Sequence, residues 1–230
     1  MFKGFVMVRE YQLFTVFSAG MTVAAFLLGR KAVFTELKQT ENEEICRKSR
    51  IIWTLICIAG FTGISILFYS RKAVPVERLI FLLYVFLYSS LIGIVDLFSH
   101  NYYLEMLPGL LPFIPIGCIT WGSTDALAGL LAGICIGIIL AVTEWLFFRR
   151  LSYGGGDTVY GAAVSALIGY SNFFLYWGIF SLILIIAGLV HIVFVKAVLR
   201  QSIEDNRFVP LLPWFSILTV ILYAVLITNN

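Results

Sequence analysis

Two aspartates, Asp96 and Asp157, are the side chains best suited to chemistry in a chain that is otherwise strongly apolar. Asp96 ends an apolar run, within Ile94-Val95-Asp96-Leu97, and Asp157 opens another run directly after Gly154-Gly155-Gly156. A carboxylate is costly to place at membrane depth, so each is a functional candidate by default. Their residue type and position indicate a shared role, although 61 residues separate them.

Two carboxylates held close together share one proton, because like charges resist a second ionisation in a medium of low dielectric. The ionised carboxylate can take a proton from water, while the protonated one hydrogen-bonds a scissile carbonyl and stabilises the developing oxyanion. The shared proton belongs to the pair, so neither residue is assigned as acid or base. Two carboxylates at the same membrane depth, as predicted for Asp96 and Asp157, are what aspartic proteolysis requires.

The three glycines before Asp157 have two interpretations. Without a Cβ, Gly154, Gly155 and Gly156 permit positive φ and let a substrate strand lie close to the chain, with its amide near the aspartates. Equally, they form an ordinary glycine turn in which Asp157 is the N-cap of the following helix. A third carboxylate, Asp125, opens a further apolar run after Gly122-Ser123-Thr124, and there the N-cap interpretation is favoured.

The elements that must position these residues are membrane helices. Of 230 residues, 60% are hydrophobic and 13% are charged, with mean hydropathy +0.96. This composition argues against a soluble globular domain and excludes intrinsic disorder. Apolar segments are expected at about 11–29, 51–69, 79–98, 107–121, 125–148, 158–171, 173–195 and 209–228. They predict an all-α, polytopic bundle of about eight transmembrane helices that forms one integral membrane domain, 1–230.

Two of these segments are unusual. The segment 107–121 is short and carries Pro108, Pro112 and Pro115, so we expect it to be bent. The segment 158–171 is also short and rich in glycine, alanine and serine. Small residues let helices approach closely, which predicts a central position for this segment.

Charge placement predicts the topology. With eight spans, the loops 30–50, 99–106, 149–157 and 196–208 share one side and hold eleven of the sixteen Lys and Arg residues. The positive-inside rule puts that side in the cytoplasm and both termini outside. Asp96 and Asp157 then face the cytoplasmic end of the bundle. The four cysteines form no CxxC pair, which argues against a zinc site. Water activation by the aspartate pair needs no metal or organic cofactor, and none is expected.

These residues resemble the type IV prepilin peptidase family, bacterial membrane aspartic proteases with a Gly-x-Gly-Asp motif. Gly154-Gly155-Gly156-Asp157 matches that motif, and the stretch 124–133, beginning Thr124-Asp125-Ala126-Leu127, resembles the family's run before it. Ile94-Val95-Asp96 with Leu107-Pro108 is similar to the first catalytic aspartate and its downstream Leu-Pro, and 209–213 to the proline pair that opens the last span. The resemblance covers roughly residues 75–225, the expected catalytic core.

The resemblance implies a peptidase of the bacterial inner membrane that removes the leader from type IV prepilins or pseudopilins at the cytoplasmic face. It implies that Asp96 and Asp157 are catalytic, and it implies no nucleic-acid partner. The chain departs from the family's pattern at four places, among them the cytoplasmic loop and the residues after Asp157. The loop 30–50 carries only Cys46 where the family usually has a zinc-binding domain, which argues against N-methyltransferase activity. The chain reads Asp157-Thr158-Val159, without the lysine that the family often has there.

Two alternatives remain open at the level of sequence. One is a catalytically inactive homologue that binds pilin-like helices. The other is a small cation- or proton-coupled transporter, since a proline-broken helix and buried carboxylates also suit transport. The position of both aspartates at one predicted face, with no visible inverted repeat, favours the peptidase over the transporter.

Overall fold

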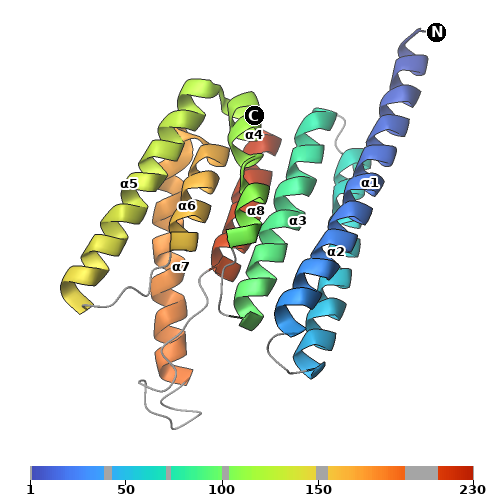
Figure 1. Cartoon of the computed structure of the whole chain (residues 1–230). Helices are drawn as coiled ribbons and strands as arrows, with labels where there is room; N and C mark the ends of the chain where they lie inside the picture. The colour runs from blue at the N-terminus through green and yellow to red at the C-terminus, as the bar shows by residue number, and fades with distance from the viewer. Residues whose placement is uncertain are drawn as a thin grey trace. The chain divides into compact units, whose positions relative to one another are not determined.

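The computed structural model describes residues 2–38, 43–70, 74–99, 104–148, 155–194 and 212–229, and Figure 1 shows the whole chain. These residues are almost entirely helical and contain no strand, which confirms the predicted all-α class. The helices are α1 (Phe2–Lys38), α2 (Glu43–Ser70), α3 (Val76–Ser99), the 3₁₀ helix η1 (Leu104–Leu110), α4 (Phe113–Trp121), α5 (Ser123–Phe148), α6 (Gly155–Ile168), the 3₁₀ helix η2 (Tyr170–Asn172), α7 (Phe173–Phe194) and α8 (Leu212–Asn229).

The expected apolar segments correspond to these helices with shifted ends. Helix α1 extends well beyond the apolar run 11–29 at both ends, and α2 begins eight residues before the run 51–69. The proline-bearing segment 107–121 is broken, as expected: Pro108 lies inside η1, and Pro112 precedes the first residue of α4. The start of the last segment, 209–211, lies outside the described residues.

The chain divides into two compact units. The first contains Met1–Ser99 and Val220–Asn230, and the second contains His100–Thr219. Asp96 belongs to the first unit, whereas Asp125, Asp157 and the glycines before it belong to the second.

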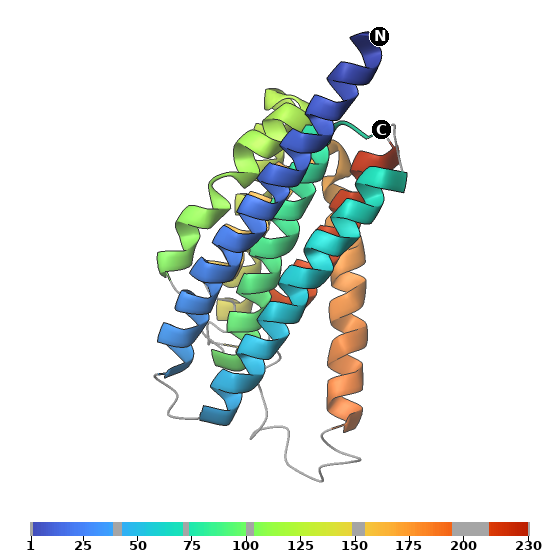
Figure 2. The same cartoon turned by 90° about the vertical axis from the view of Figure 1, so that its right-hand side faces the viewer.

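In the first unit, α1 and α2 pack antiparallel, and Figure 2 shows the two helices side by side. The Phe14 and Phe68 rings stack with centroids 4.0 Å apart. At the other end of the pair, a Cβ on Gly29 would lie 2.5 Å from the nearest atom of the Trp53 ring. The Nε1 of this ring donates a 3.4 Å hydrogen bond to the Phe26 carbonyl. The missing side chain at Gly29 therefore makes room for the buried indole.

In the second unit, α6 occupies a central position. Every residue from Tyr160 to Ile168 is buried, and α6 contacts η1, α4, α5 and η2. Aromatic rings on α7 and α8 pack beside it: the Phe180 and Phe215 rings stack at 3.5 Å, and the Tyr160 ring meets Phe215 edge-on at 5.9 Å. The small side chains of 158–171 thus lie inside the unit, as their composition predicts.

Several helices are long and apolar enough to cross a membrane. They are Arg47–Tyr69, Val76–Leu97 and Ser123–Thr143, and a fourth candidate is the pair Gly155–Ile168 and Tyr170–Ile183, which is bent by 105°. Met106–Trp121 and Leu212–Thr228 are shorter apolar segments. On α5 the buried positions are small (Ala126, Gly129, Gly133, Gly137), whereas Leu127, Leu131, Ile134 and Ile138 are exposed. Small residues inside and large apolar residues outside are typical of a helix in lipid.

Candidate functional site

The first turn of α6 carries the aspartate of the glycine motif. Gly155 and Gly156 are the first two residues of the helix, and Asp157 follows them, half-buried. Gly154 lies outside the described residues. The glycines permit positive φ, but Gly155 does not adopt it, because α6 already begins there. Among the residues that the structure describes, positive φ occurs at Gly122 and Gly169.

The space around Gly155 is open. The residue is exposed, and a Cβ placed on it would meet nothing within 4 Å in the described part of the chain apart from its own helix. Three residues further along, Thr158 is half-buried, and the burial of α6 is complete from Tyr160 on. Among the described residues, the first turn of α6 is therefore exposed at Gly155, next to Asp157, whereas the helix from Tyr160 on is buried.

Three glycines on α5, spaced four residues apart, allow the backbones of α5 and α6 to approach closely. Gly129, Gly133 and Gly137 lie on one face of α5, because residues four apart share a face of a helix. A Cβ on Gly133 would lie 2.7 Å from the Ala162 Cα, and one on Gly137 would lie 3.1 Å from the Thr158 Cβ. This is the small-xxx-small packing of membrane helices, and its Gly137 end fixes the residue next to Asp157.

The other end of α6 is held by α4. A Cβ on Gly117 would overlap the carbonyl of Ala166, so the two backbones touch. Trp121, the last residue of α4, donates a 2.8 Å hydrogen bond from Nε1 to the Leu167 carbonyl. That carbonyl lies in the last turn of α6, where carbonyls lack partners within the helix.

A buried hydrogen-bond chain joins the middle of α6 to α7. The Trp177 Nε1 donates to Ser165 Oγ at 3.0 Å, and the Ser165 hydroxyl donates to the Gly161 carbonyl at 2.7 Å. The serine thus satisfies the indole N–H without leaving its own proton unpaired. Ser165 is fully buried. Its bond to the Gly161 carbonyl, four residues back, is the usual one for a helical serine, whereas its bond to Trp177 on the next helix could not be predicted from the sequence.

Asp125 has a role different from the expected one. It lies in the first turn of α5, and its carboxylate accepts hydrogen bonds from the Ser171 N–H at 3.1 Å and the Ser171 hydroxyl at 2.9 Å. The prediction of an N-cap for its own helix therefore missed the bond to η2. Gly169, with φ of 75°, lies so close to Asp125 that a Cβ there would overlap the carboxylate. Asp125 therefore stabilises the turn between α6 and α7 through its hydrogen bonds to Ser171.

Asp96 lies in the last turn of α3, half-buried, directly after the buried Ile94 and Val95. Asp96 belongs to the first unit and Asp157 to the second. Their pairing stays a prediction of the sequence. In the part of the chain that the structure describes, no group of three His, Cys, Asp or Glu side chains could hold a metal ion.

A comparison of the chain with protein-family models, with curated proteins and with solved structures yields no match.

Proposed function

We propose that this chain is a membrane-embedded aspartic endopeptidase that removes the leader peptide from type IV prepilins or pseudopilins at the cytoplasmic membrane face. The observation that carries the proposal is the first turn of α6, in which Asp157 follows glycines and stands beside the open space at Gly155. An extended substrate segment could approach the carboxylate there, because no side chain at Gly155 blocks it.

The packing of α6 supports this proposal. A catalytic carboxylate must be held in a fixed position, since misplacement by about 1 Å can cost on the order of 100-fold in rate. Gly137 packs on Thr158, adjacent to Asp157, and Gly133 packs on Ala162 one turn further along. The glycine contacts therefore fix the part of the α6 backbone from which the Asp157 side chain projects.

In the proposed reaction, Asp96 and Asp157 share one proton. The ionised carboxylate takes a proton from a water molecule, whose oxygen attacks the scissile carbonyl, and the protonated carboxyl donates a hydrogen bond to the carbonyl oxygen. The C–N bond then breaks, and the departing nitrogen takes up a proton. The products are the leader with a free carboxylate and a mature chain with a new amino terminus.

The membrane arrangement is part of the proposal. We propose eight spans in the bacterial inner membrane, with both termini outside, because eleven of sixteen basic residues then lie in the cytoplasm. The outward-facing leucines and isoleucines of α5 support a position in lipid. The apolar helix of the substrate would dock among the spans by side-chain packing.

One observation favours a second candidate, the cation- or proton-coupled transporter. The 105° bend between α6 and α7 gives a broken helix pair, and ion sites in transporters are often built at such breaks. Ion flux into liposomes that contain the purified protein tests this candidate. An inactive pilin-binding homologue would bind precursors without cleaving them.

The test of the main proposal is co-expression with pilin-like precursors from the same genome. Leader removal is read as a shift in gel mobility, and mass spectrometry of the mature chain identifies the cleaved bond. Cleavage immediately before the apolar helix of a precursor is the expected result. Intact precursors that still co-purify with the folded protein would favour the inactive homologue.

A further inference from the structure

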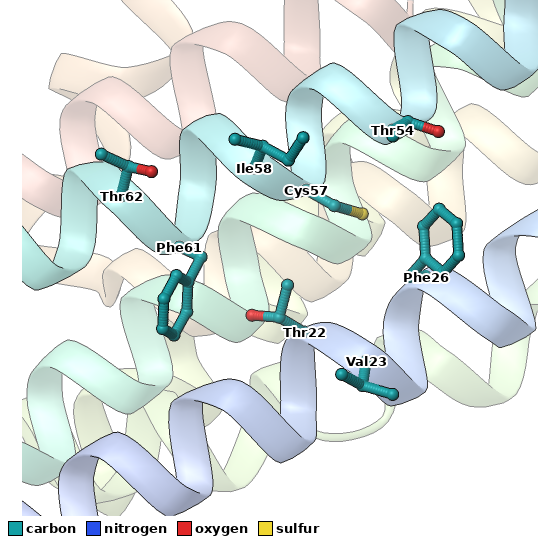
Figure 3. A pocket seen from close by; sticks show the side chains of 8 residues that line it. All are labelled: Thr22, Val23, Phe26, Thr54, Cys57, Ile58, Phe61 and Thr62. Atoms are coloured by element: carbon teal, nitrogen blue, oxygen red, sulfur yellow. The ribbon is translucent and has the colours of Figure 1, made fainter.

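A groove of about 260 Å³ runs between α1 and α2 in the first unit, and Figure 3 shows the side chains that line it. Its lining is almost wholly apolar: Thr22, Val23, Phe26, Thr54, Cys57, Ile58, Phe61 and Thr62. Thr22 and Thr54 donate their hydroxyls to carbonyls of their own helices, of Ser18 and Arg50, each at 2.8 Å. The groove therefore presents hydrocarbon to whatever fills it, and the exposed Val23 and Ile58 show that it is open.

At one end of the groove, basic residues lie on the same helix faces as the residues that line it. On α1, Arg30 follows Phe26 by four residues, and on α2, Arg50 and Arg47 precede Thr54 by four and seven. Residues at these spacings lie on the same face of a helix. Arg30 and Arg47 are exposed, and Arg50 is half-buried. The segment 30–50 as a whole carries six basic and four acidic residues, so its net charge is positive.

The dimensions match one leaflet of a bilayer. From Thr54 to Thr62 the groove follows α2 for about 12 Å, at about 1.5 Å per residue, while one leaflet of the hydrocarbon core is about 15 Å thick. At the other end of the groove α2 carries no basic residue, since its remaining residues, 63–70, are all uncharged. An apolar groove with basic side chains at one end is complementary to a lipid that has apolar acyl chains and a negatively charged headgroup.

We propose that an anionic phospholipid occupies this groove, with an acyl chain between α1 and α2 and its phosphate beside Arg30 and Arg47. The site adds to the proposed peptidase activity and does not depend on it. Charge complementarity selects the occupant, because the basic end attracts anionic headgroups of the leaflet on the side of the segment 30–50. A neutral lipid would fill the same groove but would gain nothing from the arginines.

Native mass spectrometry tests the site on the full-length protein in neutral detergent, with phosphatidylglycerol and phosphatidylcholine added at equal concentration. We expect phosphatidylglycerol to be retained preferentially. The exposed double variant Arg30→Gln/Arg47→Gln should lower retention of phosphatidylglycerol by roughly tenfold and leave that of phosphatidylcholine unchanged. Arg78→Gln, at the start of α3, is the charge control and should retain both lipids as the native chain does.

A second pair of variants tests the groove itself. Thr22→Phe fills it and should reduce retention of both lipids, whereas Ala24→Phe, exposed on the same helix and outside the lining, should not. Equal retention of the two lipids by the native chain would overturn the proposal, as would unchanged retention in the double arginine variant. A dimer that dissociates in Thr22→Phe would also overturn it and would assign the groove to a second copy of the chain. If Thr22→Phe fails to fold, the arginine variant decides alone.

Discussion

Gly137 on α5 lies against the side chain of Thr158 on α6, and a Cβ at position 137 would be 3.1 Å from the Thr158 Cβ and closer still to its methyl group. Thr158 is the residue that follows Asp157. The contact therefore connects a helix without catalytic groups to the backbone that carries the proposed catalytic carboxylate, and the same row of small residues continues through Gly133 and Gly129.

The first prediction concerns this row of glycines. Gly133→Ala places a methyl group 2.7 Å from the Ala162 Cα, so one helix must move, and we expect a loss of stability of about 1–3 kcal/mol. Thermal unfolding in detergent measures it. Gly178→Ala on α7 is the matched control: a Cβ there meets nothing within 4 Å, and stability should rise by about 0.5–1 kcal/mol. Equal effects at the two positions would show that α5 and α6 are not in close contact.

The second prediction concerns the buried bond between Ser165 and Trp177. Ser165→Ala leaves the indole N–H without an acceptor, which should cost about 1–3 kcal/mol of stability. In Trp177→Phe/Ser165→Ala both polar groups are gone, so we expect the double variant to lose less stability than the sum of the single variants. Additive losses would mean that the two side chains are not hydrogen-bonded.

The third prediction separates Asp125 from the proposed catalytic residues. Asp125→Ala removes the acceptor for Ser171 and should lower stability by about 1 kcal/mol, because the hydrogen bonds are exposed to solvent. Ser171→Ala retains the backbone N–H as donor and should cost less. Cleavage by Asp125→Asn should stay within a few fold of the native rate, measured at a temperature at which both proteins are folded. A complete loss of cleavage in the folded variant would place Asp125 in the reaction.

The fourth prediction concerns topology. With eight spans, reporter domains fused after residue 150 and after residue 72 should report the cytoplasm and the outside, respectively, and a fusion at Asn230 should report the outside. If α6 and α7, which are bent by 105° at their junction, form one broken span, the fusion at Asn230 will report the cytoplasm instead. That outcome would contradict the eight-span topology and leave the position of the loop 149–157 unchanged.

Much of the fold could be predicted from the sequence, because apolar segments and helix breakers act locally. The prolines of the segment 107–121 predicted that it is not one straight helix, and the small residues of 158–171 indicated a central helix. The extension of α1 and α2 into polar sequence was missed, because the segments were predicted from apolar residues alone, whereas a helix can continue past its apolar run.

The sequence identified candidate residues for the site, but it did not predict the contacts that these residues make. From its neighbours in the sequence Asp125 resembles an N-cap. Its bond to Ser171 depends on the fold, which brings together two residues 46 positions apart in the chain. The helical start at Gly155 also differs from the expected glycine loop, since glycines allow a turn without requiring one. The pairing of Asp96 with Asp157 remains a prediction that rests on chemistry and on the resemblance.

The most direct test of the central claim is cleavage of a pilin-like precursor by Asp96→Asn and Asp157→Asn, with Asp125→Asn as the matched control and folding checked by size exclusion. Asparagine keeps the shape of each side chain and removes its ability to exchange a proton. The proposed dyad predicts that each of the two variants lowers the rate of cleavage by more than about 1000-fold, while the control cleaves normally. Leader removal that survives at the native rate in either Asp96→Asn or Asp157→Asn would contradict the aspartic mechanism.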